Sequence, residues 1–172
     1  VNVIAAGMGL GNFAEDDLVL ETLLEHKGAL VLDADLFYEK CIIKILQSSD
    51  NLVLTPHPKE FASLLAITGV AKVSAKEIQE QRFYFAREFT KRFKNAVLVL
   101  KGANTIIAKG DEVYVNPLGS SKLAKGGSGD VLAGMIGALL AQGYTPLEAG
   151  KSASLAQALA AKSCECSNFG LS

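Results

Sequence analysis

The stretch Ala124-Lys125-Gly126-Gly127-Ser128-Gly129-Asp130, followed directly by the apolar residues 131–141, places a glycine-rich turn at the start of a helix. Glycines let successive backbone N–H groups point toward one spot, and the first helical turn adds unpaired donors and the positive end of a dipole. A phosphate group fits such a turn. Asp130 could instead simply cap the helix, a role worth about 0.5–2 kcal/mol, but capping leaves the three crowded glycines unexplained.

The composition is typical of a globular domain, because 49% of the 172 residues are apolar and 20% are charged. The formal net charge of −1 gathers neither nucleic acid nor anionic lipid, so we expect neither as a partner. No apolar run reaches the roughly 20 residues that cross a bilayer. Cys41, Cys164 and Cys166 cannot all pair and lack the spacing of a zinc site, which predicts a reducing, cytoplasmic location.

Short apolar strands alternate with amphipathic helices along the chain. This alternation predicts a mostly parallel sheet covered on both faces, with ligands at the carboxyl ends of the strands. Ser74 and Glu77 have the spacing of a capping box. We expect strands at Val3–Ala6, Ala29–Leu32, Leu52–Leu54 and Ala96–Leu100, a hairpin over 105–108 and 112–115, and helices over 15–26, 36–46, 59–66, 75–94, 129–142 and 146–164.

Polar motifs follow the first two predicted strands. The glycines of Gly7-Met8-Gly9-Leu10-Gly11 either let the backbone approach a ligand or only permit a tight turn with positive φ. In Asp33-Ala34-Asp35, two carboxylates suit Mg²⁺ or sugar hydroxyls. Asp35 is also a plausible helix cap, so Asp33 is the stronger candidate for binding.

Two further motifs follow the third and fourth strands. In Thr55-Pro56-His57-Pro58-Lys59-Glu60, the prolines hold His57 extended, which favours ligand contact over an ordinary surface histidine, while Glu60 could equally cap the next helix. The loop Lys101-Gly102-Ala103-Asn104-Thr105 suits a nucleotide lying against backbone, with Lys101 at a phosphate. A simple β-turn with a solvated lysine explains this loop equally well.

Together these motifs resemble the ADP- or ATP-dependent NAD(P)H-hydrate dehydratases of the ribokinase-like superfamily. The glycine–aspartate motif alone indicates the superfamily, and the Thr-Pro-His-Pro-x-Glu segment narrows it to the dehydratases. The resemblance implies one ribokinase-like, three-layer α/β/α domain over residues 1–172, the later two-thirds of the family domain. Because the first strands of that domain would then be lacking, we expect an N-terminal segment or a second chain to complete the sheet, and a homo-oligomer.

The resemblance also implies an activity and the residues that perform it. The family restores NAD(P)H whose nicotinamide ring has been hydrated, using ADP or ATP with Mg²⁺ to phosphorylate the added hydroxyl before phosphate is expelled. Asp130 would be the general base and touch the substrate, with an anion hole at Gly127, Ser128 and Gly129. Further substrate contacts would be Gly9, Gly11, Asp33 and His57, and the nucleotide would be bound by Lys101, Gly102, Ala103, Asn104, Thr105 and Gly129. Two alternatives stay open: a small-molecule kinase of the same superfamily, and a noncatalytic nucleotide-binding module.

Overall fold

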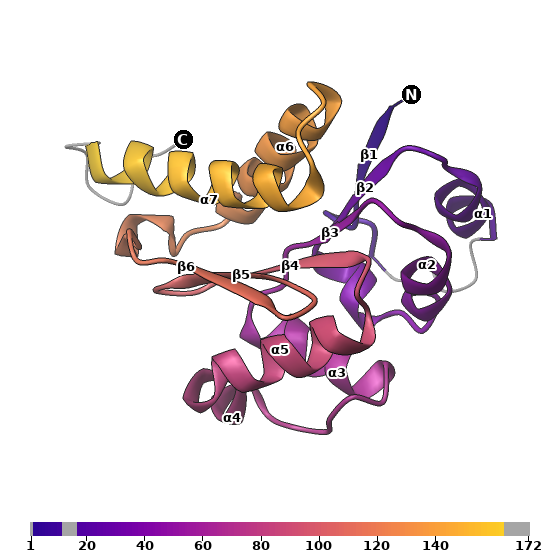
Figure 1. Cartoon of the computed structure of the whole chain (residues 1–172), viewed down its shortest axis with the longest axis horizontal. Helices are drawn as coiled ribbons and strands as arrows, with labels where there is room; N and C mark the ends of the chain where they lie inside the picture. Colours follow the sequence, from indigo (N-terminus) through magenta and orange to yellow (C-terminus); the bar gives the residue numbers. More distant parts are fainter. Residues whose placement is uncertain (1, 12–16, 164–172) are drawn as a thin grey trace.

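The computed structural model describes residues 2–11 and 17–163, and its centre is a six-stranded sheet (Figure 1). The strands lie side by side in sequence order. The first four are parallel, and the last two are antiparallel to their neighbours. This confirms the predicted strands and the mostly parallel sheet. The strands are β1 Val3–Ala6, β2 Ala29–Leu32, β3 Leu52–Leu54, β4 Ala96–Leu100, β5 Thr105–Lys109 and β6 Glu112–Asn116.

Helices cover both faces of the sheet, which gives the three layers that were expected (Figure 1). One layer contains α1 Asp17–Glu25, α2 Ile42–Ser48, α3 Pro58–Ile67, α4 Ala75–Glu80 and α5 Arg82–Arg92. The other layer contains α6 Ser128–Ala141 and α7 Pro146–Ser163, drawn in orange and yellow. Two short 3₁₀ helices, η1 Ala34–Tyr38 and η2 Ser121–Leu123, lie in the connections.

The buried strands show a different side chain to each layer. In β3, Leu52 and Leu54 pack toward the layer of α1 to α5, whereas Val53 packs toward α6 and α7. The smaller valines suit the alanine- and glycine-rich helices on their side, which approach the sheet closely. A Cβ on Gly150 of α7 would lie 3.0 Å from a methyl carbon of Val99, so this glycine sets the distance between helix and sheet.

The structure corrects two helix predictions. Residues 36–46 are not one helix, because η1 ends at an extended Glu39 (φ −100°, ψ 131°) and α2 begins afterwards. Residues 75–94 are likewise divided into α4 and α5 by Gln81, whose φ of −132° and ψ of 40° are not helical. The pieces on either side of each break pack on the same core, so the apolar periodicity continues across it. The predicted capping box of Ser74 and Glu77 is confirmed.

Some predictions fall partly outside the described residues. Residues 15 and 16 of the first predicted helix lie there, as do Cys164 and Cys166. Cys41 is a free, half-buried thiol. No helix in the described part of the chain is both long and apolar enough to cross a membrane.

The predicted polar motifs lie together at the carboxyl ends of β1 to β4, on one side of the sheet. Backbone hydrogen bonds connect these ends, since the Asp33 N–H donates to the Ala6 carbonyl at 3.0 Å and the Thr55 N–H to the Leu32 carbonyl at 3.1 Å. The Lys101 N–H donates to the Pro56 carbonyl at 2.9 Å. The start of α6 reaches the same side of the sheet from the opposite layer, because Gly129 lies against the side chains of Asp33 and Lys101.

Candidate functional site

The glycine-rich turn forms the N-terminus of α6, as its sequence predicted. Gly127 caps the helix in the left-handed conformation, with φ 85° and ψ −15°. The N–H groups of Gly129 and Asp130 belong to the first turn and have no acceptor among the described residues. The turn therefore presents free backbone donors at the positive end of the α6 dipole, as an anion site requires.

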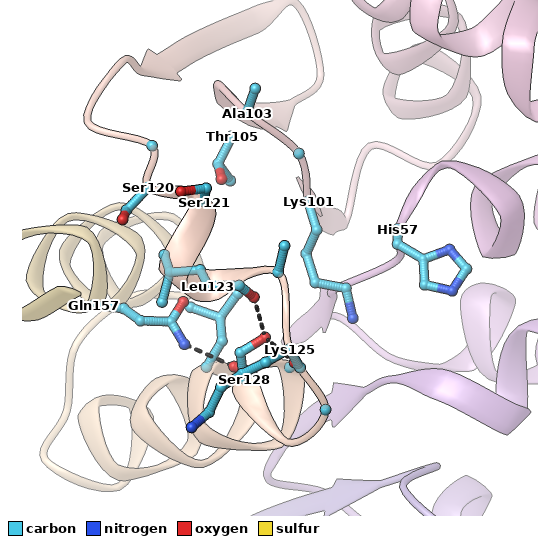
Figure 2. A pocket seen from close by; sticks show the side chains of 16 residues that line it. His57, Lys101, Ala103, Thr105, Ser120, Ser121, Leu123, Lys125, Ser128 and Gln157 are labelled. Atoms are coloured by element: carbon cyan, nitrogen blue, oxygen red, sulfur yellow. Dashed lines mark hydrogen bonds between the residues drawn. The ribbon is translucent and has the colours of Figure 1, made fainter. Parts of the chain in front are cut away.

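Ser128 shapes this turn through its own hydrogen bonds (Figure 2). Its hydroxyl donates to the carbonyl oxygens of Leu123 at 2.7 Å and Lys125 at 3.0 Å. The Gln157 side chain of α7 donates to the Ser128 carbonyl at 2.7 Å. The hydroxyl is thus committed to the turn. The Ser128 N–H also faces the Lys125 carbonyl, at the longer distance of 3.4 Å, so an anion would compete for this donor.

Asp130 lies in the first turn of α6 with an exposed side chain. It forms no hydrogen bond or ion pair with the rest of the described chain. A carboxylate in this position is stabilised by the helix dipole and remains accessible to a proton donor. Asp130 therefore has the exposure and freedom that a general base needs.

Lys101, at the end of β4, faces two carboxylates: Asp33 after β2 and Glu60 in the first turn of α3. Its ammonium lies 2.8 Å from Asp33 Oδ1 and 3.7 Å from Glu60 Oε2. Both acidic side chains are buried, at 2% exposure for Asp33 and 8% for Glu60. A Cβ on Gly129 would lie 3.1 Å from the Lys101 ammonium and 3.4 Å from Asp33 Oδ2, so α6 begins in close contact with the ion pair. The structure therefore brings Asp33, Lys101 and Gly129 together.

His57 is the N-cap residue of α3, directly before Pro58. Its Nδ1 accepts hydrogen bonds from the N–H groups of Lys59 at 3.1 Å and Glu60 at 3.2 Å, and Glu60 Oε2 accepts from the His57 N–H at 2.7 Å. Because Nδ1 is an acceptor, we assign the ring proton to Nε2, which lies 3.2 Å from Glu60 Oε1. The expected capping role of Glu60 is confirmed, and it involves His57 as well. The His57 ring is 45% exposed and also lines the cavity described below.

The first glycine loop and the Asp33-Ala34-Asp35 segment are packed against each other. Gly7 is buried with φ +117°, and the Gly11 N–H donates to Asp35 Oδ2 at 2.8 Å. Asp35 therefore holds the glycine loop, and the interpretation of it as a helix cap is wrong. Ala34 has φ +50°, the one positive value at a described residue other than glycine. Such strain between two carboxylates is typical of functional loops.

A cavity of about 770 Å³ lies between the β4–β5 loop, η2 and the start of α6 (Figure 2). Figure 2 shows Lys101 and His57 on one side of it and Ser128 with Gln157 on the other. Of the predicted residues, its lining contains His57, Lys101, Gly102, Ala103, Thr105, Ser128 and Gly129, but not Gly9, Gly11, Asp33, Asn104, Gly127 or Asp130. The sequence analysis assigned no role to the other lining residues, which are Gly119, Ser120, Ser121, Leu123, Ala124, Lys125, Gly126, Leu132 and Gln157.

Gly119, one of these residues, lies against the predicted nucleotide loop. A Cβ at this position would lie 1.8 Å from the Ala103 carbonyl oxygen. The Gly119-Ser120-Ser121 run is typical of a loop and could have directed attention to this segment. Gln157 stands within a long alanine-rich helix, and nothing in its sequence surroundings indicates a role at the cavity.

A family model for NAD(P)H-hydrate dehydratases matches residues 1–169. The chain belongs to the NAD(P)H-hydrate dehydratase family. The bifunctional NAD(P)H-hydrate repair enzyme Nnr of Helicobacter pylori is 47% identical over 160 residues, which cover 93% of this chain and 33% of that protein. The chain therefore spans about a third of the length of that curated relative. The resemblance expected from the motifs is confirmed.

Solved structures of dehydratases and related proteins share the fold. The ADP/ATP-dependent NAD(P)H-hydrate dehydratase of Bacillus subtilis, co-crystallised with ATP and Mg²⁺, is 30% identical with a TM-score of 0.80, over 99% of this chain and 61% of that one. A ribokinase-like superfamily protein of Enterococcus faecalis is 27% identical with a TM-score of 0.71, over 92% of this chain and 54% of that one. The expected ribokinase-like fold is confirmed.

Proposed function

We propose that this chain carries out the nucleotide-dependent dehydration of hydrated NAD(P)H to NAD(P)H, with ADP or ATP as phosphoryl donor and AMP or ADP and phosphate as products. The observation that carries the proposal is the meeting of the glycine-capped α6 with the Asp33–Lys101 ion pair beside a cavity of about 770 Å³. The free N–H donors and the ammonium there would receive phosphate groups. Family membership supplies the reaction class.

In this proposal Asp130 is the general base. Its carboxylate would accept the proton of the substrate hydroxyl as the hydroxyl oxygen attacks the terminal phosphorus of the nucleotide. The backbone N–H groups at Gly127, Ser128 and Gly129 would stabilise the negative charge that develops on the transferred group. The phosphate then leaves with the C–O bonding electrons, assisted by the ring nitrogen lone pair, and a neighbouring carbon loses a proton to restore the double bond.

The remaining site residues divide between the two ligands. We assign hydrated NAD(P)H to Gly9, Gly11, Asp33 and His57, and the nucleotide to the β4–β5 loop from Lys101 to Thr105 together with Gly129. The lining of the cavity supports the second assignment more directly than the first, because it contains four of the five loop residues.

The chain suits Mg²⁺ that arrives bound to the nucleotide. The described residues contain no cluster of three or more acidic, histidine or cysteine side chains that could hold a metal ion. Mg²⁺ usually keeps several waters and needs only one or two carboxylates beside substrate phosphates. Asp33 and Glu60 already face the Lys101 ammonium at 2.8 and 3.7 Å, so the nucleotide phosphates and water would supply the ligands of the ion. The ion would neutralise phosphate charge when bound.

The organisation around this site belongs to the same proposal. We infer that residues 1–172 form part of one dehydratase domain in a cytoplasmic homo-oligomer. The position of β1 at an edge of the sheet supports a further partner strand, from another segment or a second chain, because an unpaired edge is prone to association.

The test is an assay of the longest natural chain that carries this sequence. It is mixed with hydrated NADH, Mg²⁺ and either ADP or ATP, and dihydronicotinamide absorbance is followed together with released phosphate. Equal recovery of NADH and phosphate is expected. A stable phosphate ester without free phosphate would instead indicate a kinase, and nucleotide binding without turnover would indicate a noncatalytic module.

Asp130→Asn tests the proposed base within this assay. Turnover should fall by about 10²–10⁴-fold, as expected for the loss of a general base, while the nucleotide still binds. Asp111→Asn is the matched control, because Asp111 is exposed in the β5–β6 turn at the opposite edge of the sheet. Near-normal turnover of Asp130→Asn would overturn the assignment.

A further inference from the structure

Arg82 of α5 binds the β4–β5 loop, about 20 residues further along the chain, through three hydrogen bonds. It is the first residue of α5, directly after the break at Gln81. Its Nη1 donates to the Asn104 carbonyl at 2.8 Å. Its Nη2 donates to the Leu100 carbonyl at 3.0 Å and to the Lys101 carbonyl at 3.1 Å. One guanidinium therefore connects the two ends of the loop.

The loop is shaped to fit this guanidinium. Gly102 has φ +155°, and a Cβ on it would lie 2.7 Å from Arg82 Nη2. Any other residue at this position would press on the arginine. The glycine expected to let a nucleotide approach the backbone thus also lets the loop close around Arg82.

The grip of Arg82 also sets the direction of a backbone donor. In a trans peptide the N–H points away from the C=O, so fixing the Lys101 carbonyl toward Arg82 turns the Gly102 N–H to the other side. This N–H has no acceptor among the described residues. Gly102 lines the cavity, so a free donor is fixed in the wall where the nucleotide is proposed to bind.

The charge of Arg82 is left without an acidic partner. No carboxylate in the described ranges lies within 4.0 Å of its guanidinium nitrogens, and its buried Nε has no hydrogen-bond partner there. Burial lowers the pKa of Arg82, yet an arginine side chain stays protonated in proteins. Carbonyl oxygens are therefore the groups in the described ranges that face this half-buried cation, and an anionic ligand on the loop would gain from its field.

We propose that Arg82 is a positioning residue that holds the β4–β5 loop in its nucleotide-binding shape. The inference rests on the proposed function, in which this loop binds ADP or ATP. It accounts for the break between α4 and α5, because a continuous helix through Gln81 would give Arg82 a different direction.

The experiment measures ligand binding by calorimetry on the longest natural chain, with Arg82→Met compared with Arg87→Met. Arg87 is exposed on the same helix, and its side chain forms no hydrogen bond or ion pair with the described residues, so it controls for the loss of one positive charge from α5. The dissociation constant of ADP with Mg²⁺ should rise about 10- to 100-fold in Arg82→Met, as expected for lost charged hydrogen bonds, and should stay within about twofold in Arg87→Met.

A second ligand separates positioning from general destabilisation. The affinity for hydrated NADH should change less than about threefold in Arg82→Met, and the KM for ADP should rise while kcat at saturating ADP stays within about threefold. A parallel loss of both affinities would show a merely structural arginine and overturn the inference. Arg82→Lys keeps the charge but not the planar fork, so it should fold and still bind ADP about 3- to 10-fold more weakly.

The outcomes distinguish this inference from the proposed function. ADP affinity unchanged in Arg82→Met or in Arg82→Lys would overturn the role of Arg82 while leaving the dehydratase proposal intact. Failure of the unaltered chain to bind either ADP or ATP would overturn the proposed function, and with it this inference.

Discussion

Gly7→Ala adds a single methyl group where the glycine loop meets the backbone of Asp33. Gly7 has φ +117°, and a Cβ on it would lie 1.7 Å from the Asp33 carbonyl oxygen. A positive φ costs a residue other than glycine about 1–2 kcal/mol, and forcing a carbon into a packed site adds about 1–3 kcal/mol. Relief of the overlap strains the bond from the Asp35 N–H to the Gly7 carbonyl (3.1 Å), whose loss adds about 1 kcal/mol. We therefore expect a loss of about 3–6 kcal/mol in the free energy of unfolding.

Gly9→Ala is the matched control for this prediction. Gly9 has φ +68° in the same loop, but a Cβ there meets no described atom within 4 Å, so only the backbone cost of about 1–2 kcal/mol applies. Urea unfolding followed by circular dichroism measures both variants, and equal m-values show that they unfold over the same transition. Losses that agree within about 0.5 kcal/mol would refute the argument from overlap, since the overlap and the hydrogen bond that it strains separate the two expected values.

Two further predictions concern the nucleotide loop and a helix cap. Gly119→Ala places a Cβ 1.8 Å from the Ala103 carbonyl oxygen, so ADP affinity measured by calorimetry should fall about 10-fold, an estimate from the cost of overpacking. Gly110→Ala, in the β5–β6 turn outside the cavity lining, meets open space and should leave ADP affinity unchanged. Hydrogen bonds from the Ser74 backbone and hydroxyl hold the pKa of Glu77 below its ordinary value. The Glu77 carboxylate therefore stabilises the fold fully above its unfolded pKa of about 4.3, and this stabilisation is lost as the pH falls through the lower pKa of the folded state. Glu77→Gln should therefore unfold at lower urea concentration than the unaltered chain at pH 7 and at the same concentration near pH 2, and a difference that grows toward low pH would contradict the sign.

The strands and their order follow from the sequence because each strand is a short, wholly apolar run between polar turns. Val97, Leu98 and Val99 are buried on both faces of the sheet, so they show no polar alternation, as in other parallel sheets. Parallel strands end at one edge, and this geometry is enough to predict that Asp33 and Lys101 approach each other. That part of the candidate site was therefore accessible without coordinates.

The rest depends on contacts between residues that are distant in sequence. Gln81 is an ordinary helix former, and the helix breaks there while the next residue, Arg82, bonds to carbonyls 18 to 22 positions later. His57 was expected to contact a ligand, but its Nδ1 is occupied by the backbone of α3. The local sequence is compatible with a continuous or a broken helix at Gln81, and with a ligand-binding or a helix-capping His57. Only the packing of the whole chain selects between these structures.

The same parallel arrangement puts the amino ends of the strands on the side of the sheet opposite the cavity, where the chain can be modified without touching the site. The turns that lead into β2, β3 and β4 lie there, a full strand length from the cavity, and two of them are joined by a hydrogen bond of 2.7 Å from Asn95 to Asp50. Lys94, exposed beside this bond, is a suitable place to insert a short peptide tag, because exposed turns tolerate insertions. A sensor tethered through Lys94 would hold the protein by the side of the sheet opposite the cavity and leave the proposed nucleotide site facing the solution.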